Sequence, residues 1–273
     1  MRTPPNIADR ASLDRNRSRM TATFMLDAVA DEIQERLIEV NRPFNAPAIV
    51  SGQPEYWATH FPDAVQVADT DLLTLDTGRH DLVIHAMSMH WANDPIGQIV
   101  QSRHALKPDG LFLGAMFGGQ TLHELRTVLA EAESRVTGGL SPRVAPMAEI
   151  RDLGALLQRS GMALPVADAM PLNVTYEDAW ALMRDLRAMG EANALSQRLR
   201  KPTRRAVFDE AAKLYAEHFS DADGRIRATF EVIFLTGWAP DESQQKPLRP
   251  GSATARLADA LGAKELNLPQ TDD

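Results

Sequence analysis

The chain has 273 residues, 24% of them charged, with a formal net charge of -8 and a pI near 5.4. This charge opposes the broad positive field that attracts nucleic acid or an anionic membrane, so we expect neither as a partner. The absence of cysteine excludes disulfides and thiolate metal sites, and no apolar run is long enough to span a bilayer. These features predict a soluble, cytoplasmic protein without a membrane span.

The first 22 residues carry several arginines with no apolar run behind them, which is not the pattern of a secretory signal. We expect residues 1–22 to form a loose N-terminus. From 23 to 40 the apolar residues recur at helical spacing, which predicts an amphipathic helix. A short strand at 48–50, a brief helix at 54–61 and a second strand at 65–68 are expected to follow.

Residues 81–117 give the clearest pattern in the chain. Residues 82–87 are almost wholly apolar, as is typical of a parallel strand covered on both faces. Asp94 followed by Pro95 is typical of a helix start, and the Pro-Asp-Gly sequence at 108–110 should end that helix. A strand at 111–117 comes next. The order strand, helix, strand implies a right-handed parallel crossover.

Beyond this unit, the pattern predicts helices at 121–136, 147–160, 178–189 and 204–219, and strands at 166–176 and 225–238, the last one antiparallel. We expect one α/β domain over residues 23–266, with a helical insertion at about 178–220, and a disordered tail over residues 267–273. A cluster of basic residues at the junction near 200 is most simply a solvated surface.

Three loops should lie at the carboxyl edge of the sheet, where open parallel sheets bind ligands. They span residues 51–55, 88–94 and 118–120. In the middle loop, His90 could act as a general base and Trp91 could form a pocket wall, although a merely hydrogen-bonded histidine and a packed indole are the simpler alternatives. Gly118 and Gly119 would permit a close backbone approach or only a turn. The histidine spacing does not favour a metal site, so none is expected.

Two long strings, H-D-L-V-I-H-A-M-S-M-H-W-A-N-D-P and L-K-P-D-G-L-F-L-G-A-M-F-G-G-Q-T-L-H-E-L-R, resemble the class I S-adenosylmethionine-dependent methyltransferase superfamily. Within it, the chain is most similar to the branch of mitochondrial respiratory complex I assembly factor five and its bacterial relatives. Later strings such as M-R-D-L-R-A-M-G-E-A-N-A and T-G-W-A-P-D-E-S-Q-Q-K-P fit the same branch. The resemblance covers roughly residues 24–261.

The resemblance implies a Rossmann-like methyltransferase fold, with a mostly parallel sheet flanked by helices, and S-adenosylmethionine as cofactor. It also implies a role in complex I assembly, reportedly through hydroxylation of an arginine in a subunit, while a related branch methylates malonyl carrier protein. Carried over by position, the candidate residues are Ser51, Gly52, Asp69 and Met87 for the cofactor, His90 for catalysis, and Trp91, Asn93, Gly118 and Gly119 for the substrate pocket. Asp69 could contact either the ribose or the adenine.

The sequence departs from the family at the first loop. The family has a Gly-x-Gly-x-Gly loop there, whereas this chain has V-S-G-Q-P-E-Y-W, with Gly52 alone. The 24 residues from 46 to 69 suffice for one crossover, while two crossovers need on the order of 50 residues. We therefore expect a fold shortened at the first crossover, with one strand and its helix missing.

Two functions remain open. The first is a methyltransferase-fold protein with an eroded cofactor loop that acts on or chaperones a protein partner, such as a complex I subunit. This function would be favoured if Tyr56 or Trp57 filled the adenosine cavity. The second is an active S-adenosylmethionine-dependent methyltransferase with a carrier-protein or small-molecule acceptor. Hydroxylation of a protein arginine ranks lower, because no iron-binding triad is recognisable in the sequence.

Overall fold

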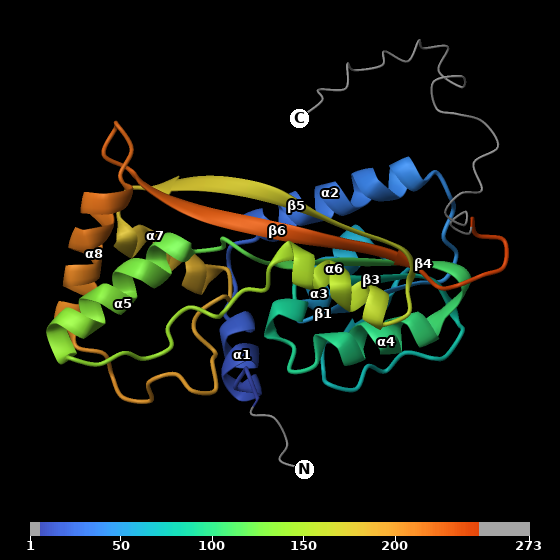
Figure 1. The fold of residues 1–273 in the computed structure, drawn as a ribbon, viewed down its shortest axis with the longest axis horizontal. Helices are drawn as coiled ribbons and strands as arrows, with labels where there is room; N and C mark the ends of the chain where they lie inside the picture. Colours follow the sequence, from blue (N-terminus) through green and yellow to red (C-terminus); the bar gives the residue numbers. More distant parts are fainter. Residues whose placement is uncertain (1–5, 246–273) are drawn as a thin grey trace, which may run out of the picture. The chain divides into compact units, whose positions relative to one another are not determined.

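The computed structural model describes residues 6–245, and its contacts divide the chain into residues 1–241 and 242–273. The fold of the first unit is a single mixed sheet with the strand order β2-β1-β3-β4-β6-β5 (Figure 1). The strands are β1 (Pro47–Ser51), β2 (Val65–Ala68), β3 (His80–Ala86), β4 (Leu106–Phe117), β5 (Ala163–Tyr176) and β6 (Ile226–Trp238).

The helices alternate with the strands along the first half of the chain. In order they are α1 (Arg10–Arg17), α2 (Phe24–Val40), α3 (Pro54–His60), the 3-10 turn η1 (Met89–Trp91), α4 (Pro95–Ala105), α5 (His123–Thr137), α6 (Ile150–Arg159), α7 (Ala179–Ala188) and α8 (Arg205–Phe219). None of the described helices is both long and apolar enough to cross a membrane.

The predicted strand-helix-strand unit is confirmed. β3 and β4 pair in parallel on either side of α4 in the chain, and β1 and β2 continue the parallel part of the sheet. β6 runs antiparallel to both β4 and β5, as predicted for the last strand. Every residue of β3 is buried, because helices cover both faces of the sheet at its centre.

Alternate residues of the strands supply two separate cores. On one face, Ile49 and Ile84 pack with apolar side chains from α2, α3, α5, α7 and α8. On the other face, Val50 and Val83 pack with α4 and α6. This period of two follows from the alternating direction of side chains along a strand, and it fixes the register of the sheet against both helix layers.

The first crossover is shortened, as predicted. β1 and β2 are direct neighbours, and only the seven-residue helix α3 lies between them in the chain. Trp57 of this helix is completely buried in the core that contains α2. A single large side chain therefore anchors the compressed connection.

The predicted end of the α4 helix was wrong by a few residues. The helix ends at Ala105, and β4 begins at once with Leu106, which pairs with His80. The Pro-Asp-Gly sequence at 108–110 lies inside the strand, at a register shift where Asp109 has a φ of 58°. These turn-forming residues therefore produce an irregularity in the strand instead of a helix stop.

The N-terminus that was predicted to be loose contains the helix α1. Asp9 caps this helix, and its side chain accepts a hydrogen bond from the Ser12 backbone N–H. Leu13 and Arg17 are buried, because the helix packs against the carboxyl edge of the sheet and the segment after α7. α7 and α8 lie in the range given to the helical insertion, and the predicted tail, residues 267–273, lies outside the described residues.

Candidate functional site

The carboxyl ends of β1, β2 and β3 bring the predicted cofactor residues together. Ser51 ends β1 and pairs with Ala68 on one side and Ala86 on the other, so Asp69 and Met87 follow at the same edge. The Ser51 hydroxyl accepts a hydrogen bond from the Gln53 N–H at 3.2 Å, which tightens the loop that holds Gly52. Sequence reasoning placed this edge correctly.

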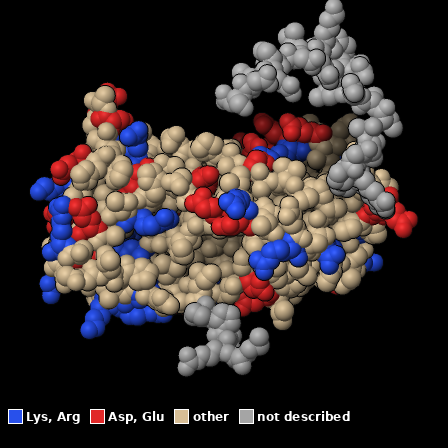
Figure 2. All heavy atoms as spheres, viewed as in Figure 1, with Lys and Arg blue, Asp and Glu red and all other residues tan. Residues whose placement is uncertain are grey.

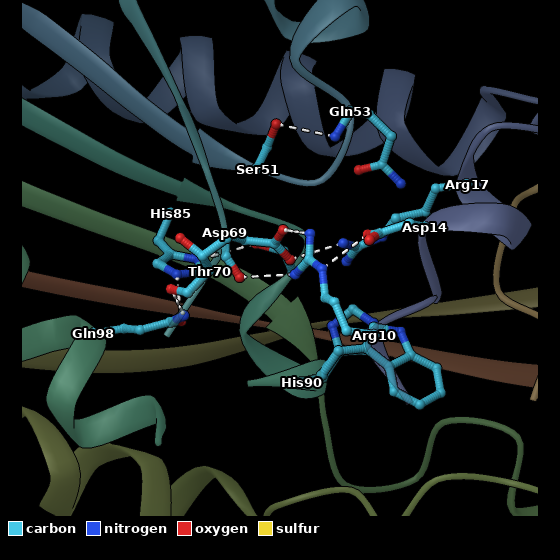
Figure 3. Close-up of polar contacts among 12 residues, drawn as sticks. Arg10, Asp14, Arg17, Ser51, Gln53, Asp69, Thr70, His85, His90 and Gln98 are labelled. Atoms are coloured by element: carbon cyan, nitrogen blue, oxygen red, sulfur yellow. Dashed lines mark hydrogen bonds and ion pairs between the residues drawn. The ribbon is translucent and has the colours of Figure 1, made fainter. Parts of the chain in front are cut away.

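Asp69 is bound by two arginines of α1, which sequence reasoning did not connect with this site. Arg17 donates from Nη1 to Oδ2 at 2.8 Å, and Arg10 donates from Nη2 to Oδ1 at 2.7 Å (Figure 3). Arg10 also donates to the Asp69 carbonyl at 2.9 Å. The side chains of Arg17 and Asp69 are each only 3% exposed, so this ion pair belongs to the protein interior.

The two arginines decide the ionisation of Asp69. Burial alone would raise the pKa of this carboxyl group, but the charge of Arg17 and the hydrogen bond from Arg10 outweigh that effect and hold the pKa below its usual value. Asp69 is therefore an anion throughout the physiological range. Arg10 and Arg17 of the same chain already compensate the negative charge of Asp69.

Arg17 also lies against the one glycine of the first loop. A Cβ atom built on Gly52 would lie 2.1 Å from Arg17 Nη1, which no side chain could tolerate without movement. The bare backbone at Gly52 thus admits a guanidinium from the same chain. Nε and Nη2 of Arg17 have no hydrogen-bond partner among the described residues.

His90 and Trp91 lie in η1 beside a third residue, Glu191, which sequence reasoning did not single out. The Trp91 indole donates to Glu191 Oε2 at 2.8 Å, and His90 Nε2 lies 3.4 Å from the same oxygen. The His90 ring also contacts Phe117, with ring centroids 5.0 Å apart. The only sequence signal for Glu191 was its place in the family-like string M-G-E-A-N-A.

Glu191 is an ionised group at a largely apolar place. Burial alone would raise its pKa, but the neighbouring His90, assisted by Arg17 and the Trp91 N–H, lowers the pKa below its usual value. Both contacts with η1 use Oε2. Oε1 accepts no hydrogen bond in the part of the chain that the structure describes.

Glu191 and Trp91 border a cavity of about 240 Å³. Its other walls are mainly apolar side chains from α5, α7, α8 and β6, such as Leu125, Met183 and Phe208, and they also include Arg143 and Arg187. A pocket of this kind, apolar with a few polar groups, is the usual form of a small ligand site. The predicted wall role of Trp91 is consistent with this position, and the position of Glu191 adds an anion to it.

Asn93 lies elsewhere, in a second and more polar cavity of about 540 Å³ beside Asp69. Its side chain accepts a hydrogen bond from the Ile7 N–H at 2.9 Å and so holds the segment that leads into α1. Trp91 borders this cavity too, from its other side. The structure therefore separates Asn93 from the apolar cavity.

Gly118 and Gly119 are not among the residues that line either cavity. A Cβ on Gly118 would lie 2.1 Å from Ile233 Cδ1, and Gly119 has a φ of 30° with the Glu231 carboxylate close by. Both N–H groups donate to backbone carbonyls, those of Glu231 and Ala148. The simpler alternative, a tight turn, accounts for this glycine pair. No group of three or more metal-ligating side chains is arranged to hold an ion within residues 6–245.

Comparison with known proteins extends these observations. No protein-family model matches the chain. The zebrafish protein named "Arginine-hydroxylase NDUFAF5, mitochondrial" is 36% identical over 231 residues, which are 85% of this chain and 71% of that protein. The human protein of the same name is 38% identical over 201 residues, 74% of this chain, but the match spans only 58% of the human protein.

A malonyl-[acyl-carrier protein] O-methyltransferase from Laribacter hongkongensis is 31% identical over 69% of this chain and 61% of that enzyme. Among solved structures, a candidate methyltransferase from Bacillus halodurans matches 76% of this chain and 98% of its own length, with a TM-score of 0.48 and 12% identity. By its similarity to the zebrafish protein, this chain belongs to the NDUFAF5 family, within the class I S-adenosylmethionine-dependent methyltransferase superfamily.

Proposed function

We propose that this protein binds an arginine-containing segment of a protein partner, with the arginine side chain in the apolar cavity and its guanidinium at Glu191. The observation that carries the proposal is an ionised carboxylate, Glu191, at the wall of a cavity lined mainly by apolar side chains. Arg143, which is paired with Glu133, and Arg187 also line this cavity. A side chain with a long aliphatic stem and a charged head matches that combination. The names of the zebrafish and human relatives, which describe arginine hydroxylases, support arginine over lysine.

The surface charge supports a protein partner of complementary sign. Residues 184–205 contain seven arginine or lysine residues and two acidic ones, in a chain whose net charge is -8. Figure 2 shows Lys and Arg interspersed with Asp and Glu at the side where α5 and α8 lie, so the excess of positive charge belongs to residues 184–205 and not to these two helices. The excess of positive charge in this segment favours a partner in which acidic residues flank the arginine, although Arg198 and Arg200 are already paired with Asp9. Following the family resemblance, we propose a subunit of respiratory complex I as the partner and retain the cytoplasm as the location.

The test uses the methionine methyl groups as reporters. Met147 and Met183 border the cavity, while Met162 lies in the core on the other face of the sheet. N-acetyl-arginine methylamide, titrated into protein labelled with ¹³C-methyl methionine, should shift the two cavity signals and leave Met162 unchanged. The neutral citrulline analogue, of nearly equal shape, should bind roughly 10 to 100 times more weakly, because it loses the charge-assisted hydrogen bond.

Two variants complete the test. Glu191→Gln keeps an oxygen acceptor for Trp91 but removes the charge, so it should weaken arginine binding by the same roughly 10- to 100-fold factor. Glu149→Gln is the matched control, because Glu149 is exposed and does not line the cavity. Equal affinity for the arginine and citrulline compounds would reject the proposal. In the native host, Glu191→Gln should also fail to restore complex I assembly to a deletion strain.

A second candidate function is methyl transfer, and one observation favours it. The polar cavity of about 540 Å³ adjoins Asp69 and Trp91, so it could accommodate part of a nucleoside. Transfer of a labelled methyl group from S-adenosylmethionine to a carrier-protein or small-molecule acceptor, lost in His90→Ala, would establish this function. If no methyl group is transferred to an acceptor of either class, the second candidate is rejected and the binding function remains the proposal.

A further inference from the structure

The site offers one test of whether S-adenosylmethionine fits the residues that are present. A methyltransferase loop receives its cofactor along a bare glycine backbone, and here Arg17 already lies within 2.1 Å of the Cβ position of Gly52. The guanidinium cannot share this space with a ligand. A cofactor would have to displace a side chain that is 3% exposed and paired with a buried carboxylate.

Asp69, the acid expected to bind the cofactor, is likewise already bound by side chains of this chain. Oδ1 of Asp69 accepts from Arg10, Oδ2 accepts from Arg17, and the backbone carbonyl accepts from Arg10 again. A cofactor hydroxyl or amine would have to compete with two charged donors that belong to the chain itself. Charge-assisted bonds of this kind are stronger than the neutral ones that a ribose or adenine could offer.

The space that remains between the first loop and the neighbouring helix is very small. A cavity of about 10 Å³ lies among Gln53, Met87, Phe117 and Glu191. This is about the space of one water molecule, whereas ligand pockets typically measure roughly 300 to 1,000 Å³. The cavity of about 540 Å³ beside Asp69 is lined by none of the first-loop residues Ser51, Gly52 and Gln53. The residues present at the first loop therefore do not fit S-adenosylmethionine.

The aromatic residues that the sequence suggested as the filling do not provide it. Trp57 is buried in the core with α2, and the Tyr56 hydroxyl donates to Asp27 at 2.7 Å. Helix α1 fills the space beside Gly52 instead, with the side chain of Arg17. Arg17 is the last residue of that helix.

α1 is fixed on both sides by α7 and the segment that follows it. At its start, Asp9 pairs with Arg198 at 2.9 Å and Arg200 at 2.7 Å, and the Asp9 N–H donates to the Ala194 carbonyl at 2.7 Å. Just beyond its end, the Thr21 N–H donates to the Ala188 carbonyl at 2.7 Å. The helix is thus bound as an integral element of the fold.

We propose that Arg17 permanently occupies the cofactor position, so that helix α1, with Arg10 and Arg17 bound to Asp69, replaces S-adenosylmethionine as the group that completes this edge of the sheet. This inference is independent of the proposed partner site, and it excludes the second candidate function, methyl transfer. Binding at Glu191 and binding at Gly52 are measured with different ligands, so either can fail without the other.

The first test titrates the unmodified protein with S-adenosylmethionine and S-adenosylhomocysteine by calorimetry, and follows its melting temperature at millimolar concentrations of each. We expect no saturable heat and no rise in melting temperature. Saturable binding with a micromolar dissociation constant would overturn the inference, because a ligand that binds only the folded state must raise the melting temperature.

The second test is a double-mutant cycle on stability with Arg17→Met and Asp69→Asn. Each single variant should lower the melting temperature by on the order of 10 °C, and the double variant by little more than the worse single one, since each single change breaks the buried Arg17–Asp69 pair and leaves Asp69 with Arg10 alone or Arg17 without a carboxylate. Arg19→Met is the matched control, because Arg19 is exposed just beyond α1 and should change the melting temperature by about 1 °C at most. If Arg17→Met behaved like Arg19→Met, the inference would fail. Where Arg17→Met does not fold, the titration of the unmodified protein still decides.

Discussion

Acidification should destabilise this protein through one histidine at the centre of the sheet. His85 is completely buried in β3, between Val50 of β1 and Gly114 of β4. Its Nε2 lies 2.9 Å from the Oε1 of Gln98, while the Gln98 amide group donates to the Thr70 carbonyl. This orientation of Gln98 makes Nε2 the protonated nitrogen of a neutral ring, since Oε1 can only accept.

Burial lowers the pKa of His85 from 6.5 to about 4, and the hydrogen bond to Gln98 only partly opposes this shift. The folded-state pKa lies below the unfolded-state pKa, so the unfolded chain binds the proton first as the pH falls. The stabilisation is complete above pH 6.5 and disappears as the pH falls toward 4. Its full size is about 3 kcal/mol, of which about 2 kcal/mol should be lost on going from about pH 7.5 to about pH 5.

The assay is urea unfolding of the wild-type protein and His85→Gln at a series of pH values across this range. Other carboxylates titrate in both proteins, so the informative quantity is the difference between the two pH profiles of the free energy of unfolding. His85→Gln should have a flatter profile, whereas His104→Gln, which changes an exposed histidine on α4, should reproduce the wild-type slope. A His85→Gln profile as steep as that of the wild type would refute the reasoning.

Two further predictions concern local elements. Asp94→Ala removes the side chain that accepts from the Gly97 N–H at 2.8 Å, and it should lower the free energy of unfolding by about 1 kcal/mol without changing the urea m-value. Arg143 donates to the Glu133 carboxylate from Nε at 2.9 Å and from Nη2 at 2.7 Å. Glu133→Gln should lower the free energy of unfolding by about 3 kcal/mol, because the variant removes the charged partner of Arg143. Hydrogen exchange should become faster between α5 and α6 in Glu133→Gln. Unchanged exchange there would contradict the expectation that the Glu133–Arg143 pair holds the segment between α5 and α6 in place.

Sequence patterns located the regular elements well where burial imposes a period. β3 is buried on both faces and α2 on one, and this burial produces the apolar run of β3 and the helical spacing of apolar residues in α2. Both elements were therefore predicted within a few residues. α1 was missed because its eight residues contain only one large apolar side chain, Leu13, and its stability comes from ion pairs with distant residues. Ion pairs between residues far apart in the chain produce no periodic pattern in the sequence from which a helix could be predicted.

The same limit applies to the site. The carboxyl edge could be predicted from strand order alone, and it holds Ser51 and Asp69 as expected. The partner of Asp69 is 52 residues away, and that of His90 and Trp91 is about 100 residues away. Neither Arg17 nor Glu191 could be assigned by spacing, because only the folded chain brings these residues together.

The attachments of α1 also govern when the chain can complete its structure during synthesis. This helix is translated before its partners Asp69 and Arg200, which follow their α1-side partners by 52 and 191 residues in the chain. A helix of eight mostly polar residues is not stable alone in water, so it must wait unfolded until most of the chain has emerged. α1 is therefore translated well before the residues that hold it, and it can acquire all its native contacts only after Arg200 has been synthesised.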